Sequence, residues 1–294
     1  MKRMKIESSV WLAACLVLVA TVWGGCTERE LSERPSDGPL KINLVWDDAE
    51  YEVSGALLWL YGSDGTLYQA VRSEAEGYEA RVPADVYTVL VVNADCINAE
   101  HDGEEDADFC SMDAEVLASG TSPLLAQVEH VYCTGLGGIE VKPGNVTTEV
   151  TLYPEDVVKH IRFDIDPNYL DNVASLTVNM GGIVPSVYMM DGEDTQEATG
   201  IVSVEAQPAQ EGHYDAQMSV FGWRGLNVVT VTVVYEDGRE ETSLPEDITD
   251  DLEGLPEEGG SISLTVQMPD GSTLDITAIV SGWDDSGTGS GDVW

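Results

Sequence analysis

The sequence predicts an all-β protein whose strands form antiparallel sandwiches. Runs of roughly five to nine residues, rich in β-branched and aromatic side chains, recur from Leu40 onward and are separated by Gly, Asp, Pro and Asn. No amphipathic helical stretch of ten to fifteen residues separates these runs, as an α/β fold would require. In 227–235, apolar residues occupy every odd-numbered position from 229 to 235, so one face of the strand is wholly apolar.

The chain begins with a segment that has the layout of an export signal. Three basic residues precede an apolar stretch over 10–23, and two glycines then precede Cys26. A charged end, an apolar region of this length and a small-residue cleavage site are typical of a signal peptide rather than of a spanning helix. A cysteine directly after the small pair is the residue that is diacylated in bacterial lipoproteins. The sequence therefore predicts a lipoprotein signal peptide over 1–25 and a covalent lipid on Cys26, which holds the mature chain to a bilayer.

Two features of the leader leave an alternative open. Trp23 stands three residues before the lipidation cysteine, where such signals usually carry Leu. A second match to the pattern ends at Cys15, but too short an apolar region precedes it. The alternative is an ordinary secreted protein, cut after Ala20 or Gly25, in which Cys26 is an unmodified thiol.

The net charge limits the partners of the chain. It carries 54 acidic and 13 basic residues, which gives −41 at pH 7. Nucleic acid is excluded, because phosphate contacts need Lys and Arg, and so is electrostatic adhesion to anionic lipid headgroups. Residues 26–39 are polar and contain Pro, which predicts a flexible tether. Glu28 and Glu30, close behind Cys26, resemble the surface-export signals of Bacteroidota lipoproteins, so we expect the outer membrane and the cell surface as the location.

Residues 40–154 are expected to form an N-terminal β-sandwich. Asp64-Gly65, after Ser63, stands between two apolar runs and predicts a hairpin turn, because Gly adopts the positive φ that a tight turn demands. The expected strands are 40–46, 53–61, 66–72, 77–82, 86–93, 127–133 and 145–153.

Residues 155–294 are expected to form a second, C-terminal β-sandwich, with 153–157 as the seam. The stretch 236–260 is acidic and rich in Gly and Pro, which predicts an exposed loop. The Gly/Ser/Thr segment 286–291 near the C-terminus predicts either a mobile arm for a partner or a frayed tail. The expected strands are 158–165, 173–180, 183–190, 200–206, 214–222, 227–235, 261–268 and 273–280.

Three cysteines remain if Cys26 is acylated, so at most one disulfide forms among them. Cys96 and Cys110 flank an acidic loop and would staple it in an oxidising compartment. The alternative is that these two and Cys133 are unpaired thiols. No Cys-x-x-Cys motif occurs, and the cysteines have no neighbouring His, so no metal site is expected.

The chain lacks the sequence motifs of catalysis and metal binding. Its four histidines (His101, His130, His160 and His213) are scattered without metal-ligand spacing. No nucleophile elbow, zinc-protease helix, P-loop or dinucleotide fingerprint is found. We therefore expect no catalytic residue, no cofactor and no enzymatic activity. The acidic stretch 100–108 offers oxygen ligands for Ca²⁺ but lacks EF-hand spacing, and a solvated charged loop is the alternative.

Several segments together resemble the fimbrillin-like and fimbrial-anchor lipoproteins of Bacteroidales, which include Bacteroides lipoproteins of this length. These segments are Cys26, the first strand 41–46, the strand and turn over 58–65, the strand entry 82–93 and the passage 150–165. The strand entry is similar to the Pro-x-Gly-x-Tyr-x-Leu-x-Val-x-Asn pattern of prealbumin-like sandwiches, with Asp85 in place of the Gly.

The resemblance implies two tandem transthyretin-like (prealbumin-like) sandwiches after the signal peptide. It also implies a non-enzymatic cell-surface lipoprotein that serves in adhesion as a structural subunit or membrane anchor of a fimbria-like assembly. Its partners would be other fimbrillin-like subunits, joined where one chain supplies a strand to an exposed sheet edge of another.

A surface glycan- or ligand-binding lipoprotein is the alternative function, because aromatic rings suit the faces of sugars. Trp46 and Trp59 lie in expected strands and are predicted to be core residues. Trp223, Trp283 and Trp294 lie near turns or in the tail, which leaves them as the candidates for an exposed aromatic platform.

Overall fold

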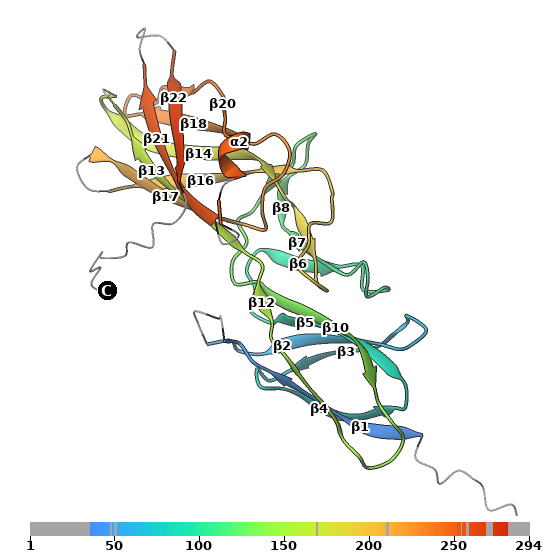
Figure 1. The fold of residues 1–294 in the computed structure, drawn as a ribbon. Coiled ribbons are helices and arrows are strands. Elements are labelled where there is room, and N and C mark those ends of the chain that lie inside the picture. The colour runs from blue at the N-terminus through green and yellow to red at the C-terminus, as the bar shows by residue number, and fades with distance from the viewer. Residues whose placement is uncertain are drawn as a thin grey trace, which may run out of the picture.

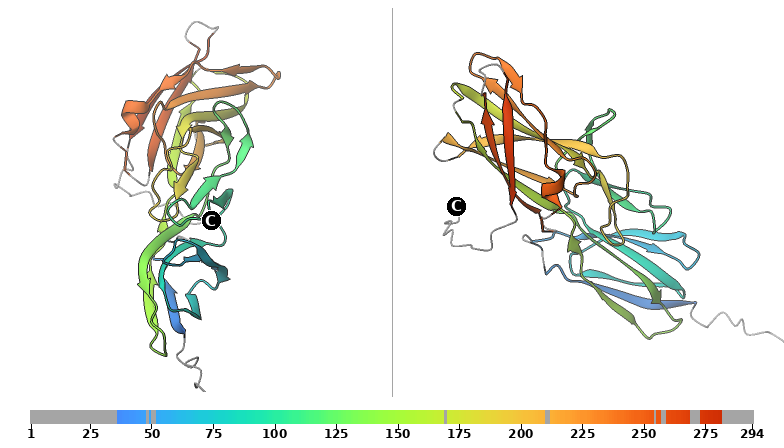
Figure 2. Two further views of the ribbon diagram at one scale, coloured as in Figure 1. Left: turned by 90° about the vertical axis from the view of Figure 1, so that its right-hand side faces the viewer. Right: turned by 45° about the horizontal axis from the view of Figure 1, so that its top comes forward.

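A computed structural model describes residues 36–47, 49, 52–168, 170–209, 212–253, 255–256, 259–268 and 273–281. The predicted signal peptide, Cys26, the segment 286–291, Trp283 and Trp294 lie outside these residues. The described chain is all-β, as predicted, and forms an elongated molecule of two lobes (Figures 1 and 2). No helix in the described ranges is long and apolar enough to cross a membrane.

The first half of the chain builds one lobe from two facing sheets. A three-stranded sheet has the order β11-β1-β4, and a five-stranded sheet has the order β12-β10-β5-β2-β3. The strands are β1 (Asp37–Leu44), β2 (Ala56–Tyr61), β3 (Leu67–Ser73), β4 (Gly77–Pro83), β5 (Val86–Asn93), β10 (Tyr132–Glu140), β11 (Thr148–Leu152) and β12 (Glu155–Asp156).

A closed apolar core fills the space between these two sheets. Leu40 and Ile42 from β1 meet Leu58 of β2 and Val89 of β5 there, and all four are fully or almost fully buried. Every second residue of β1 is buried, as expected of a strand with one face on the core. In β2 and β5 almost every residue is buried, so both faces of the five-stranded sheet are covered.

The second half builds the other lobe around a large sheet with the order β19-β18-β14-β16-β17-β13-β21-β22, and β20 pairs with β18. Its elements are β13 (Lys159–Asp166), β14 (Val173–Ile183), β15 (Ser186–Tyr188), β16 (Gly200–Pro208), β17 (Tyr214–Val220), β18 (Val228–Tyr235), β19 (Glu240–Thr242), β20 (Glu246–Asp247), helix α2 (Thr249–Leu252), β21 (Gly259–Gln267) and β22 (Asp275–Ser281).

Residues 94–131, which we call the excursion, leave the first lobe after β5 and return at β10. The excursion carries β6 (Ala99–Asp102), β7 (Ser111–Ala114), β8 (Val116–Ala118) and β9 (Leu124–Leu125). Its β7 pairs with β6 and with β15, and its β9 pairs with β8 and, in parallel, with β16, so the excursion joins its sheets to strands of the second half. These strands lie beside the second lobe in Figure 1. The sequence placed this segment within the N-terminal sandwich and predicted none of its four strands.

The base of the excursion is closed by main-chain and side-chain hydrogen bonds. Ile97 and Glu129 exchange two backbone hydrogen bonds, with N···O distances of 2.9 and 3.1 Å. Asn93, fully buried at the end of β5, donates from Nδ2 to the carbonyl of His130 at 2.6 Å and accepts from the N–H of Tyr132 at 2.9 Å. The excursion therefore leaves and re-enters the first lobe at one fixed point.

The excursion covers the outer face of the five-stranded sheet. Trp59, Leu90 and Val92 point away from the inner core and are buried against Met112 and Leu125 of the excursion and its neighbours. The same apolar cluster continues without a break into the core of the second half. The two lobes thus share one core, which joins them by more than a linker.

Two sequence expectations are corrected in detail. Only Tyr132 and Cys133 of the expected strand 127–133 are in β10, which runs on through the glycine-rich segment 134–138. A side chain at Gly135 would collide with Leu90 and Met190, so this position inside the strand needs a glycine. Glycine there marks close packing and not the end of the strand. The expected exposed loop 236–260 contains β19, β20 and α2, and buries Leu252 at 2 % exposure.

Candidate functional site

The two halves flank their first long strand in the same way. In the first half β1 lies between β4, which is antiparallel to it, and β11, which is parallel. In the second half β13 lies between β17, antiparallel, and β21, parallel. The position beside β11 in one half therefore corresponds to the position beside β21 in the other.

These two corresponding positions differ in what fills them. In the second half β22 pairs with β21 along its whole length, from Gln267↔Asp275 to Ser261↔Ser281. Ile276 of β22 points into the core and is 3 % exposed. In the first half β11 pairs with β1 alone and is the edge of its sheet in the described structure. The edge of β11 is therefore a candidate docking site for an additional strand.

The hydrogen-bond register shows which groups of β11 face this open edge. The N–H of Val45 donates to the carbonyl of Leu152 at 3.1 Å, so Leu152 faces β1. In a parallel ladder every second residue turns both its N–H and its C=O to the same neighbour. Val150 and Thr148 therefore face β1 as well, whereas the backbone groups of Glu149 and Thr151 point to the open edge.

An ion pair fixes β11 against β1 on the solvent side of the sheet. Lys41 Nζ lies 2.6 Å from Glu149 Oε1, and Asn43 Nδ2 donates to the same oxygen at 3.0 Å. The hydrogen bond from Lys41 lowers the pKa of the Glu149 carboxyl, with Asn43 acting in the same direction. The strand contains no Pro and no bulge, so its outer edge is regular enough for another strand to pair with it.

The structure keeps the three described cysteines as free thiols. The structure does not contain the Cys96–Cys110 disulfide that the sequence left open. The two side chains lie in separate environments. Cys96 Sγ lies 3.7 Å from the carbonyl oxygen of Ala99, whereas Cys110 Sγ packs 3.4 Å from Met189 Sδ in the shared core. Burial raises the pKa of the Cys110 thiol to about 11 and that of Cys133 to about 12, which keeps both protonated and unreactive at neutral pH.

The four histidines do not share one site, although His130 and His160 both line one cavity near Asp156. His101 stacks near Trp59, at 4.9 Å between ring centroids, and contacts Glu104. His160 Nδ1 lies 3.0 Å from Ser219 Oγ, and His213 Nδ1 lies 3.1 Å from Asp164 Oδ1. Among the described residues, which include the whole of 100–108, no group of three or more His, Cys, Asp or Glu is arranged to hold a metal ion.

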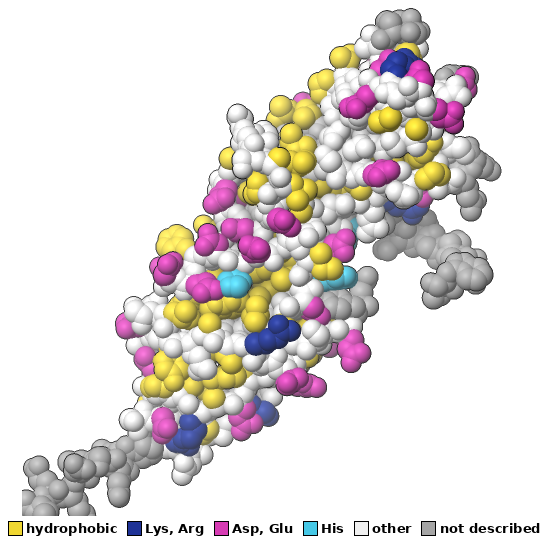
Figure 3. Space-filling view, turned by 180° about the vertical axis from the view of Figure 1, so that it is seen from behind, with side chains coloured by type: hydrophobic (Ala, Val, Ile, Leu, Met, Phe, Trp, Pro, Cys, Tyr) yellow, Lys and Arg dark blue, Asp and Glu magenta, His cyan; other side chains and the backbone are white. Residues whose placement is uncertain are grey.

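Of the described tryptophans only Trp59 lies where the sequence predicted, in the core; Trp46 was expected there too, and Trp223 was expected to be exposed. Trp59 is 2 % exposed, and Trp46 is half-buried with its Nε1 donating to the carbonyl of Ala75 at 2.7 Å. Trp223 is half-buried. Acidic side chains are scattered over the face seen in Figure 3, and Lys and Arg are few there, as the net charge requires.

No protein-family model and no curated protein sequence matches the chain. Solved structures do match it over most of its length. A proposed adhesin from Bacteroides ovatus has a TM-score of 0.63 at 15 % identity, over 86 % of this chain and 97 % of that one. The fimbrial anchor protein Mfa2 from Porphyromonas gingivalis has a TM-score of 0.54 at 14 % identity, over 84 % and 98 %.

A third solved structure, a proposed polysaccharide-binding protein from Bacteroides thetaiotaomicron, has a TM-score of 0.52 at 11 % identity, over 84 % and 96 %. The chain shares the fold of these proteins. The likeness to fimbrillin-like and fimbrial-anchor proteins that the sequence predicted is thereby confirmed at the level of the fold. Because each match covers nearly all of the other chain, it includes both halves.

Proposed function

We propose that this protein is a non-enzymatic lipoprotein of the cell surface that takes part in adhesion as a structural subunit or membrane anchor of a fimbria-like assembly. The observation that carries this proposal is the shared two-lobed fold, which extends over 98 % of a fimbrial anchor protein. In this proposal the two lobes are tandem transthyretin-like sandwiches, and the partners are other subunits with the same fold.

The anchor in this proposal is the lipid on Cys26, added after removal of residues 1–25. Of the predicted tether 26–39, residues 37–39 belong instead to β1 and pair with β4. The polar segment before β1 would lead from the outer membrane to this strand, whose first residues lie at the far end of the first lobe (Figure 1). The large negative charge keeps such a surface layer soluble and self-repelling.

Assembly would use the edge of β11. A strand from another subunit that pairs there would gain backbone hydrogen bonds from Glu149 and Thr151, and its alternate side chains would extend the core face of the sheet. The second half supports this geometry, because β22 shows what the corresponding position looks like when a strand fills it.

The experiment is a pull-down of the protein from its native cell envelope, with the wild type compared with three variants. Cys26→Ala removes the lipid site and is expected to release the protein from the cell. Thr151→Pro removes an outward N–H and is expected to abolish co-purification of other subunits, since Pro is tolerated at a sheet edge but cannot donate to an added strand. Thr151→Ala is the matched control, because it removes the side chain and keeps the N–H.

Partner subunits that co-purify with the wild type and with Thr151→Ala, but not with Thr151→Pro, would support assembly at β11. Equal recovery of partners with Thr151→Pro would exclude this edge. A lone lipid-modified monomer without any partner would contradict the fimbrial role, and retention of Cys26→Ala in the membrane would contradict the anchor.

A further inference from the structure

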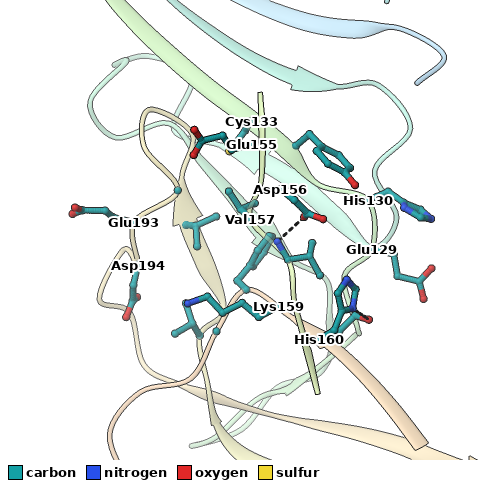
Figure 4. A pocket seen from close by; sticks show the side chains of 18 of the residues that line it. Glu129, His130, Cys133, Glu155, Asp156, Val157, Lys159, His160, Glu193 and Asp194 are labelled. Carbon is teal, nitrogen blue, oxygen red and sulfur yellow. Dashed lines mark hydrogen bonds between the residues drawn. The ribbon is translucent and has the colours of Figure 1, made fainter. Parts of the chain in front are cut away.

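A cavity of about 1460 Å³ lies where the two lobes meet. The chain link 155–160 crosses it, and its walls come from β10, the loop after β15, β17 and the segment around Trp223 (Figure 4). A typical small-molecule pocket has roughly 300–1,000 Å³. The cavity is therefore large enough for an extended ligand, which would touch both lobes at once.

Trp223 is the aromatic wall of this cavity, and its position is fixed by its surroundings. Its backbone forms a bridge with Ile183, and the next residue, Arg224, pairs with Asp194 through Nε at 2.9 Å. Lys159 Nζ lies 5.5 Å from the centre of the indole ring. The ring is therefore held in place before a ligand arrives, with the Lys159 ammonium over one of its faces, so a ligand that stacks on the other face meets a preorganised surface.

The polar side chains of the cavity lie on two sides of the link. In Figure 4, Glu129, His130 and Asp156 gather on one side, and Lys159 and Glu193 point to the other. Burial raises the pKa of the Asp156 carboxyl, although it accepts a hydrogen bond from the N–H of Val158 at 2.9 Å. Carboxylates outnumber the one lysine in these walls, which makes them negatively charged, and Gln, His, Tyr, Thr and Ser side chains of the lining supply hydrogen-bond donors as well.

The carboxylates of the walls and the indole ring together indicate which kind of ligand fits the cavity. Carboxylates without enough cations repel an anion and accept hydrogen bonds from a ligand rich in donors. The indole ring favours a ligand with an apolar face. Sugars offer both, because each ring carries hydroxyl donors at its rim and C–H groups on its faces.

We propose that the cavity between the lobes binds a neutral oligosaccharide, with Trp223 as the stacking surface and the carboxylates of the walls as hydroxyl acceptors. This site is separate from the β11 edge. It does not depend on the assembly proposed above, and a purified protein suffices to test it.

The test is calorimetric titration of the full chain with a panel of neutral oligosaccharides and a matched panel of sulfated and uronic-acid-containing ones. Neutral members are expected to bind, and anionic members to bind at least about tenfold more weakly because of the acidic walls. Trp223→Ala is expected to weaken binding about tenfold or more, and Trp223→Phe less, because it keeps an aromatic ring.

Two further variants keep the test decisive. Phe109→Ala removes an aromatic ring that is 64 % exposed elsewhere on the excursion and should leave binding unchanged. Gln217→Ala, at an exposed cavity wall, should weaken binding several-fold even if Trp223→Ala fails to fold. The proposal is overturned if no neutral glycan binds, if anionic glycans bind equally well, or if folded Trp223 and Gln217 variants bind like the wild type. None of these results would affect the assembly test.

Discussion

The two halves of the molecule begin from the same strand arrangement and complete it differently. In the second half, the chain's own β22 pairs along the outer edge of β21. In the first half, the corresponding strand β11 is left at the edge, whereas the outer face of the other sheet is covered by the excursion. The counterpart of β11 in the second half is therefore covered by the chain's own next strand, and β22 is the edge of that sheet.

This difference shows that the first half covers the exposed face of a sheet but leaves the exposed edge of a sheet uncovered. A bare apolar sheet face costs hydrophobic free energy over its whole area, so the outer face of the five-stranded sheet is covered by the excursion. A bare edge exposes backbone groups that water can satisfy, so β11 is stable without a neighbour and stays available for one.

The largest expected effect on stability comes from shortening a side chain on the outer face of β5. Leu90 faces the excursion, and the adjacent Val89 faces the inner core, yet both are fully buried. Leu90→Ala should therefore lower the free energy of unfolding by about 2–5 kcal/mol in urea denaturation, as for any core leucine. Leu117→Ala, at an excursion residue that is 57 % exposed, should change it by less than about 0.5 kcal/mol. If Leu90→Ala matched that control, the excursion would not cover the sheet.

A smaller effect is expected at the base of the excursion. Asn93→Ala removes the side chain that bonds the backbone of His130 and Tyr132 and leaves those buried groups without it. The expected cost is about 1–3 kcal/mol, with faster amide exchange at 129–132. Asn145→Ala, at an exposed residue of the first lobe, is the control and should be nearly neutral. Unchanged exchange at 129–132 would show that the Ile97–Glu129 pair closes the base without help.

The smallest effect on stability is expected at Asp156, in the link 155–160 between the lobes. Burial raises the pKa of Asp156 above its unfolded value, so the folded state binds the proton more tightly and the charged form is destabilising. The penalty is fully present above the folded pKa and disappears below the unfolded value of roughly 3.9. Asp156→Asn, which keeps an acceptor for Val158, should therefore raise the melting temperature at pH 7 and have no effect near pH 3. An equal gain at both pH values would mean that the carboxyl charge is not the cause.

Local pattern was enough to predict the long strands, and it failed where pairing is non-local. The alternation in 227–235 and the turn at Asp64-Gly65 identify strands from neighbouring residues alone. The strands of the excursion are two to four residues long and partly polar, as in Ala99–Asp102, and they exist because distant strands pair with them. The near-continuous apolar sequence of β2 and β5 was the available signal that both sheet faces are covered.

The candidate site was less predictable than the fold. The run 145–153 was recognisable as a strand, but its place at the edge depends on sheet order, which no local pattern encodes. Trp223 was recognised as a candidate aromatic surface, whereas the cavity beside it arises from how the lobes meet. Cys26 was assigned from the leader alone, and its lipidation stays a prediction.

Amide hydrogen exchange at β11 and β21 tests most directly whether β11 is an open edge while its counterpart β21 is covered. In β21 the amides of Ser263, Leu264 and Thr265 all lie between two neighbouring strands and should exchange slowly. In β11 the amides of Val150 and Leu152, which face β1, should be slow, and those of Glu149 and Thr151 should exchange much faster, because they face the open edge. Slow exchange at Glu149 and Thr151 in the isolated protein would contradict an open edge in the first half.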